Sequence, residues 1–176
     1  MAETLNHPDE SLEHFSTKER LHTDVLEDKY GPIHSEVLEH SDSVREACLV
    51  DENGIVRTYA LTFFPEEQND QEVKDVDVEI RNGGLIGKTF REYGFGIRKN
   101  VIDVSVLEIP EWLQRKFAVD GNKAKARLSE FYAKREGGEP VVYGTVLGVY
   151  TPDFRSAEIN DIDLAQINPS TEMFQK

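Results

Sequence analysis

The chain has 176 residues, of which 38% are hydrophobic and 31% are charged, and its formal net charge at pH 7 is −14. This length and composition predict one globular domain of ordinary size. The negative charge disfavours binding to nucleic acid or to anionic membranes, because both repel an acidic surface. A small anion remains an expected partner, since a few local arginines outweigh a distant acidic surface under salt screening.

Cysteine and histidine content limits the covalent and metal chemistry of the chain. The single cysteine, Cys48, excludes an internal disulfide, and we expect it to fill a small apolar position. All five histidines, including His22, precede residue 41 without metal-ligand spacing, so we predict surface histidines and no metal or other cofactor. No stretch approaches ~18 apolar residues, and the acidic N-terminal stretch lacks a signal-peptide apolar region, which favours a cytoplasmic protein.

The first predicted elements are a lead, a helix and a strand. Residues 1–10 are polar, and we expect a flexible N-terminal lead, a segment without regular structure, there. Apolar residues recur at roughly helical spacing over residues 11–30, and Gly31-Pro32 ends the pattern. The sequence therefore predicts a helix, broken once, followed by a short strand over residues 33–38.

A hairpin and a short helix are predicted next. Two apolar runs flank Asp51–Gly54, whose residues favour a turn, so residues 44–65 are predicted to form a β-hairpin. Residues 66–77 are acidic and poor in aromatic residues, and we expect an exposed loop. The glycine-flanked segment Gly83–Phe95 carries apolar residues typical of a short helix.

The second half of the chain predicts further strands. Residues 97–109 form a β-rich run, and Pro110 is suited to open a short helix. Residues 123–135 are ambiguous, because their propensity favours helix whereas the apolar strand that follows the turn at Gly137-Gly138 needs a partner. The oligomeric state is left open.

These elements predict an α+β fold with a single antiparallel sheet and helices packed on one side. Hairpins of strands with scattered helices are typical of this class, and the sequence contains no repeat. We expect one domain over residues 11–156 and a peripheral polar tail over residues 157–176.

Arg45 is unusual because it lies in a strand with an otherwise core-like face. Alternation along the strand places Arg45 on the face of Ala47 and Leu49. A four-residue turn pairing Val50 with Ile55 would set Arg45 opposite Ala60, and a bulged turn would shift the partners by one. The other face, with Glu46 opposite Tyr59 and Cys48 opposite Arg57, is predicted to face solvent.

An arginine on an apolar face requires an anion, because removing the partner of such a charge costs ~3–5 kcal/mol. The planar guanidinium suits a carboxylate. Three interpretations are open: Arg45 pairs with a buried Asp or Glu, binds a ligand carboxylate, or reaches water at the strand end.

Three stretches in chain order carry a family resemblance. They are residues 45–65, a strand beginning Arg-Glu, a turn and a strand ending in proline; residues 83–104, a Leu-Ile-Gly turn, a short helix and a strand led by Arg98; and residues 137–154, a Gly/Pro turn and an apolar strand. Together they resemble the chorismate–pyruvate lyases, in particular the branch of archaea and actinobacteria, over roughly residues 20–156. The same fold serves as the effector-binding domain of some bacterial transcription regulators.

The resemblance implies a fold, a reaction and a binding site. Such lyases release the enolpyruvyl group of chorismate as pyruvate and leave 4-hydroxybenzoate, without a metal or cofactor. By resemblance, Arg45 binds the ring carboxylate, and the turn near Ile86 and Gly87 contributes backbone N–H groups. Arg98 begins a strand where the lyases also carry arginine.

The last strand departs from the family. The lyases carry a glutamate there that is suited to act as a general acid. This sequence has Thr145 at that position, or Gly148 in a second alignment, and neither is acidic. Tyr143 shares a strand face with Thr145 and is either a substitute donor or a packed tyrosine.

Three hypotheses follow, and they leave enzymatic activity open. The first is a chorismate lyase-like protein that converts chorismate to 4-hydroxybenzoate and pyruvate. The second is a protein of the same fold that binds a small cyclic or aromatic carboxylate without chemistry. The third is an interaction protein whose pocket is filled by its own side chains.

Overall fold

The computed structural model describes residues 21–151. Its strands are β1 (His34–His40), β2 (Val44–Val50), β3 (Val56–Phe63), β4 (Gly96–Glu108), β5 (Lys123–Lys134) and β6 (Val141–Tyr150). Its helices are α2 (His22–Tyr30), α3 (Gln71–Arg81), α4 (Ile86–Glu92) and α5 (Glu111–Phe117). The predicted lead (1–10), the first part of the predicted first helix (11–20) and the tail (157–176) lie outside the described residues.

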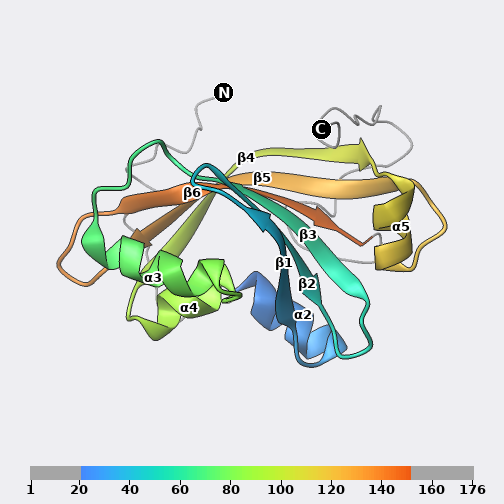
Figure 1. Cartoon of the computed structure of the whole chain (residues 1–176), viewed down its shortest axis with the longest axis horizontal. Coiled ribbons are helices and arrows are strands. Elements are labelled where there is room, and N and C mark those ends of the chain that lie inside the picture. Colours follow the sequence, from blue (N-terminus) through green and yellow to red (C-terminus); the bar gives the residue numbers. More distant parts are fainter. Residues whose placement is uncertain (1–20, 152–176) are drawn as a thin grey trace, which may run out of the picture.

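The strands form one antiparallel sheet in the order β1-β2-β3-β6-β5-β4 (Figure 1). The predicted α+β class with a single antiparallel sheet is therefore confirmed. The sheet curves over α2, α3 and α4, and we call the face that it turns toward them the inner face. Side chains of α5 pack against the opposite, outer face, so the prediction that all helices lie on one side is wrong.

The hairpin of β2 and β3 has a different register from the predicted one. Arg45 lies opposite Thr62, not Ala60, and Ala47 lies opposite Ala60. The reason is a wider turn with an irregularity after Leu49, in which Asp51 Oδ1 accepts hydrogen bonds from two turn N–H groups at 2.8 and 3.1 Å. A shift of two residues keeps every side chain on its face, so Arg45 remains on the inner face.

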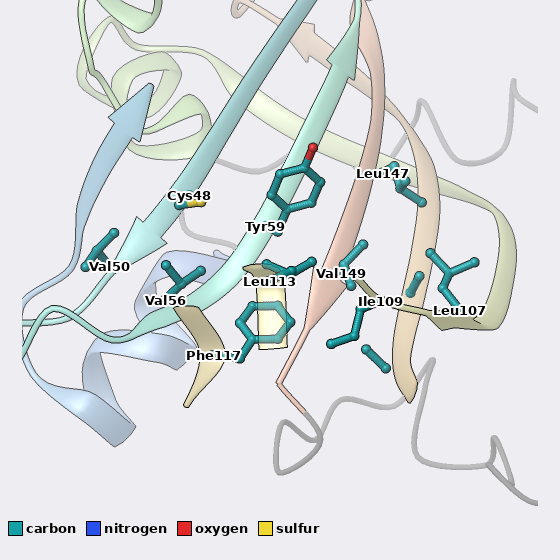
Figure 2. Close-up of a cluster of buried hydrophobic side chains, with 12 residues drawn as sticks. Cys48, Val50, Val56, Tyr59, Leu107, Ile109, Leu113, Phe117, Leu147 and Val149 are labelled. Carbon is teal, nitrogen blue, oxygen red and sulfur yellow. The ribbon is translucent and has the colours of Figure 1, made fainter. Parts of the chain in front are cut away.

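The outer face of the hairpin is buried, contrary to the prediction of a solvent face. Cys48 and Tyr59 are almost fully buried and belong to the apolar cluster that α5 covers (Figure 2). Glu46 is also buried and accepts a hydrogen bond from the Tyr59 hydroxyl. Burial raises the pKa of the Cys48 thiol to about 11, which agrees with its expected role as an apolar filler.

The predicted loop over residues 66–77 is wrong, because α3 begins at Gln71. Asp70 caps this helix by accepting a hydrogen bond from the Val73 N–H at 3.1 Å. Val73, Val76 and Ile80 share one face of α3 and are fully buried against the sheet side chains and α4. Three apolar residues at helical spacing thus outweigh the acidic composition of the segment.

The ambiguous segment over residues 123–135 is a strand. β5 pairs with β4 on one side and with β6 on the other, which places it inside the sheet. Two of its alanines, Ala124 and Ala126, pack in the outer core, where their small side chains fit beneath α5. Tertiary pairing therefore overrides the helix propensity of the sequence. The predicted strands around it and both predicted short helices are confirmed.

α2 is fastened to α4 by two ion pairs. Lys88 Nζ lies 2.6 Å from Glu27 Oε1, and Arg91 Nη2 lies 3.0 Å from Asp24 Oδ1. Although burial alone would raise the pKa of Asp24, its hydrogen bonds with Arg91 and with the Leu21 N–H hold that pKa below its usual value. These ion pairs join α2 to α4, and the 2.7 Å contact of His22 Nε2 with Thr58 Oγ1 joins its first turn to the inner face of the sheet.

Candidate ligand-binding cavity

A cavity lies between the inner face of the sheet, the first turn of α2 and the turn that leads into α4. Its floor is a row of small residues on adjacent strands, Ala47, Ala60 and Gly148. About 80 Å³ is open to water-sized molecules, which is several times the space that one water needs. The small side chains of Ala47 and Ala60 leave space above the sheet, and Gly148 makes room for the Tyr150 ring, which also lines the cavity.

Arg45 lies at one end of this cavity and is only 3% exposed. Its Nη2 donates to Ser35 Oγ and to the carbonyl oxygen of Gly84, each at 3.1 Å. Its buried Nε has no hydrogen-bond partner in the described part of the chain. The side chain is therefore fixed by two neutral acceptors, and its Nε donor is left without a partner.

No carboxylate pairs with Arg45 among the described residues. Asp77 influences the Arg45 charge, but its side chain accepts a 2.6 Å hydrogen bond from the Tyr143 hydroxyl and pairs with Arg81 at 2.5 Å. Burial lowers the pKa of the Arg45 guanidinium, and the neighbouring Tyr143 and Asp77 only partly offset this effect. Of the three sequence-based interpretations, direct pairing with a buried acid and exposure at the strand end are both wrong.

The far side of the cavity is lined from β4 and β5. Lys99, Arg127 and Ser129 line it there, and Arg127 is 8% exposed. Arg127 also lies over the Tyr150 ring, 5.7 Å from its centroid. Among the residues that line the cavity in the described range 21–151, none is Asp or Glu. A cationic cavity inside a protein of net charge −14 favours an anionic occupant.

His22 lies over the cavity at the start of α2, so the prediction of a surface histidine is wrong for this residue. Its Nε2 is 2.7 Å from Thr58 Oγ1, and its ring meets the Tyr150 ring edge-on at 5.1 Å. Burial, followed by the charges of Lys99 and Arg127, lowers the pKa of His22 well below its usual value. His22 is therefore neutral near pH 7 and forms part of the cavity wall.

The predicted site residues divide into two groups. Ile86 and Gly87 line the cavity together with Arg45. Thr145 and Arg98 do not line it, because their neighbours Val146 and Lys99 take the inner-face positions.

Tyr143 is also absent from the cavity lining, although it lies on the helix side of the sheet. An irregularity between Phe131 and Tyr132 shifts the pairing of β5 with β6 and turns Tyr143 toward Phe90 and Phe131. The expectation that it shares a face with Thr145 is therefore wrong. Its hydroxyl supports the Asp77 side chain next to Arg45, and burial raises the Tyr143 pKa.

Among the cavity residues that sequence reasoning missed are His22, Lys99, Arg127 and Ser129. The alternation of β4 provided a signal for Lys99, since it lies next to Arg98 and must face the other way. Arg127 and Ser129 were hidden because their segment was not assigned as a strand. His22 gave no signal, because its position depends on how α2 packs.

Neither a protein-family model nor a curated protein sequence matches this chain. Within the described residues, no group of histidine, cysteine, aspartate or glutamate side chains is arranged to hold a metal ion. The same part of the chain contains no helix with the length and apolar character needed to span a membrane.

Proposed function

We propose that the protein is a chorismate lyase-like protein that binds a small cyclic or aromatic carboxylate in this cavity, with the carboxylate on Arg45. One observation carries the proposal: a guanidinium that is 3% exposed lines a cavity, and no carboxylate within the described residues pairs with it. A ligand carboxylate would supply the missing charge in the geometry that arginine favours.

The surroundings of Arg45 support this ligand class. The turn residues Ile86 and Gly87 line the same cavity as Arg45, and the resemblance to the lyases implies backbone N–H donors near these two residues. Apolar atoms of Leu49 and Phe131 line the space between its ends and suit the faces of a ring. Chorismate and 4-hydroxybenzoate are the first ligands to test.

Calorimetric titration with 4-hydroxybenzoate tests the binding proposal. We expect saturable binding that Arg45→Met weakens at least about tenfold, because a charge-assisted contact is worth roughly 1.5–3 kcal/mol. Arg98→Met is the matched control, since Arg98 is half-buried on the neighbouring side of β4 but does not line the cavity. Equal losses in both variants, or no loss in Arg45→Met, would contradict the proposal.

Elimination of pyruvate from chorismate is the second candidate function. The inner-face positions of β6 are occupied by Val146 and Gly148, so the strand offers no carboxyl group as general acid. We therefore propose binding without efficient turnover. Incubation with chorismate, followed by detection of 4-hydroxybenzoate and pyruvate, separates the two functions. Product formation that Arg45→Met abolishes would establish the lyase in place of the binding protein.

A further inference from the structure

We propose that the cavity contains a second anion-binding subsite, formed by Lys99, Arg127 and Ser129 on β4 and β5, so that its preferred ligand is a compact dianion. The inference rests on the proposed function, because it assumes that Arg45 binds the first carboxylate. Arg127 and Ser129 lie outside the three stretches that carried the resemblance, and Lys99 lies within the second of them.

The second subsite combines two positively charged side chains with a hydroxyl group that has no hydrogen-bond partner within the described residues. Lys99 and Arg127 line the cavity from the neighbouring strands β4 and β5, and the charges of both contribute to the lowered pKa of His22. Ser129 is 3% exposed, and its buried Oγ has no hydrogen-bond partner within the described residues. An anionic group on a ligand would accept a hydrogen bond from this hydroxyl and meet two cations.

The strand register places the two subsites on opposite sides of the floor. Arg45 pairs with Thr62, Thr62 with Val146, and Val146 with Ser129, so the same row crosses β2, β3, β6 and β5. Three strand spacings separate the backbones of Arg45 and Ser129 by about 14 Å in a flat sheet. The sheet curves around its inner face (Figure 1), and Arg45 and Arg127 both line the cavity on that face, so we expect their charged groups to lie closer together than their backbones.

The next row explains why a ring fits between the two charges. It runs Ala47, Ala60, Gly148 and then Arg127, so three small residues lead directly to the second subsite. A side chain at Gly148 would collide with Tyr150, because an added Cβ would lie 2.6 Å from the Tyr150 hydroxyl oxygen. The Tyr150 side chain thus occupies the space above Gly148, and Ala47 and Ala60 form the open part of the floor between the two cationic ends, where a ring bearing an anion at each end would lie.

Three ligands with one ring test the second charge. Terephthalate carries two carboxylates, 4-carbamoylbenzoate replaces one of them with a neutral amide of the same shape, and 4-hydroxybenzoate carries one carboxylate. Calorimetric titration should show that terephthalate binds about tenfold to a hundredfold more tightly than 4-carbamoylbenzoate. Equal affinities for these two ligands would overturn the inference.

Variants locate the second charge on β4 and β5. Arg127→Gln and, independently, Lys99→Gln should lower terephthalate affinity about tenfold while changing 4-carbamoylbenzoate affinity less than about twofold. Lys123→Gln, on β5 but outside the cavity lining, is the control. Thermal unfolding of each variant verifies that it is folded.

The outcomes for the two proposals are distinguishable. Loss of both ligands to the same extent in the Lys99 and Arg127 variants would overturn the second subsite. If monocarboxylate binding depends on Arg45 but a second carboxylate does not raise the affinity, the second subsite is also refuted. The proposed function would still stand in that case. Absence of Arg45-dependent binding for all three ligands would refute both.

Discussion

Arg45 on β2 donates a hydrogen bond from Nη2 to the carbonyl oxygen of Gly84, 3.1 Å away. This bond joins the sheet to the turn before α4, so the position of the turn and the orientation of the guanidinium depend on each other. Gly84 is closely surrounded on its own side: an added Cβ would lie 2.7 Å from Thr89 Oγ1 and 3.0 Å from the Glu79 carbonyl oxygen.

Gly84→Ala should therefore destabilise the protein by about 1–3 kcal/mol, as overpacking does in other buried sites. The Glu79 backbone cannot rotate away, so the turn must move and carry its carbonyl oxygen away from Arg45. Urea denaturation measures the loss. Gly121→Ala is the control, because an added Cβ there meets nothing within 4 Å. Similar unfolding free energies of the two alanine variants would show that the turn at Gly84 accommodates the added methyl group without loss of stability.

Ala60→Val should remove ligand binding without loss of stability. Ala60 lies in the middle of the cavity floor, between Ala47 and Gly148. Two added methyl groups occupy the space proposed for the ring, and valine suits a strand, so we expect a gain of roughly 0.5–1 kcal/mol in unfolding free energy. Thermal unfolding with and without 4-hydroxybenzoate provides both readouts. A ligand-induced rise in melting temperature that persists in this variant would place the ligand elsewhere.

Asp77 should stabilise the buried charge of Arg45 without touching it. A double-mutant cycle of Asp77→Asn with Arg45→Met tests this coupling, and we expect about 0.5–1 kcal/mol. Asp77→Asn should destabilise the protein more when Arg45 is present than when methionine replaces Arg45. Asp75→Asn, on the exposed side of α3, should show no coupling. Additive effects in the Asp77 cycle would mean that Arg45 is insensitive to this carboxylate.

His22 should make stability depend on pH in a defined direction. Its pKa in the folded state lies below the value of about 6.5 expected when unfolded. Below pH ~6.5 the unfolded chain therefore binds the extra proton, and the unfolding free energy falls by up to about 1.4 kcal/mol per pH unit until the folded pKa is reached.

Urea denaturation between pH 7.5 and the onset of acid unfolding measures this dependence on an order-of-magnitude scale. His22→Gln should flatten the slope just below pH ~6.5, whereas His34→Gln, which replaces an exposed histidine on β1, should leave it intact. Parallel slopes for the wild type and His22→Gln would mean that the folded protein protonates this histidine normally.

The inner-face position of Arg45 was predictable from sequence, because alternation along a strand survives errors in register. Arg45 kept its face although its partner changed from Ala60 to Thr62. The buried partner of Tyr59 was not predictable: Glu46 looks like a solvent residue until α5 is known to cover the outer face. Alternation identifies which residues share a face of the sheet, but only the packing of distant helices determines which face is exposed to solvent.

The sequence alone predicted one part of the cavity lining and not the other. Arg45, Ile86 and Gly87 lie in local motifs that the resemblance identified. Arg127 depended on recognising β5, whose residues have the propensity of a helix and become a strand only through pairing on both sides. Residues brought to a site by long-range pairing leave little trace in a single sequence.

The sheet order has a consequence for how the chain acquires its cavity. β1–β3 and β4–β6 are two separate meanders, and the pairing of β3 with β6 is the seam that joins them. During synthesis, neither half has its cavity partner until the ribosome has released the strand ending at Tyr150. Arg45 belongs to one half and Arg127 to the other. A ligand that contacts both residues would therefore stabilise the pairing of β3 with β6.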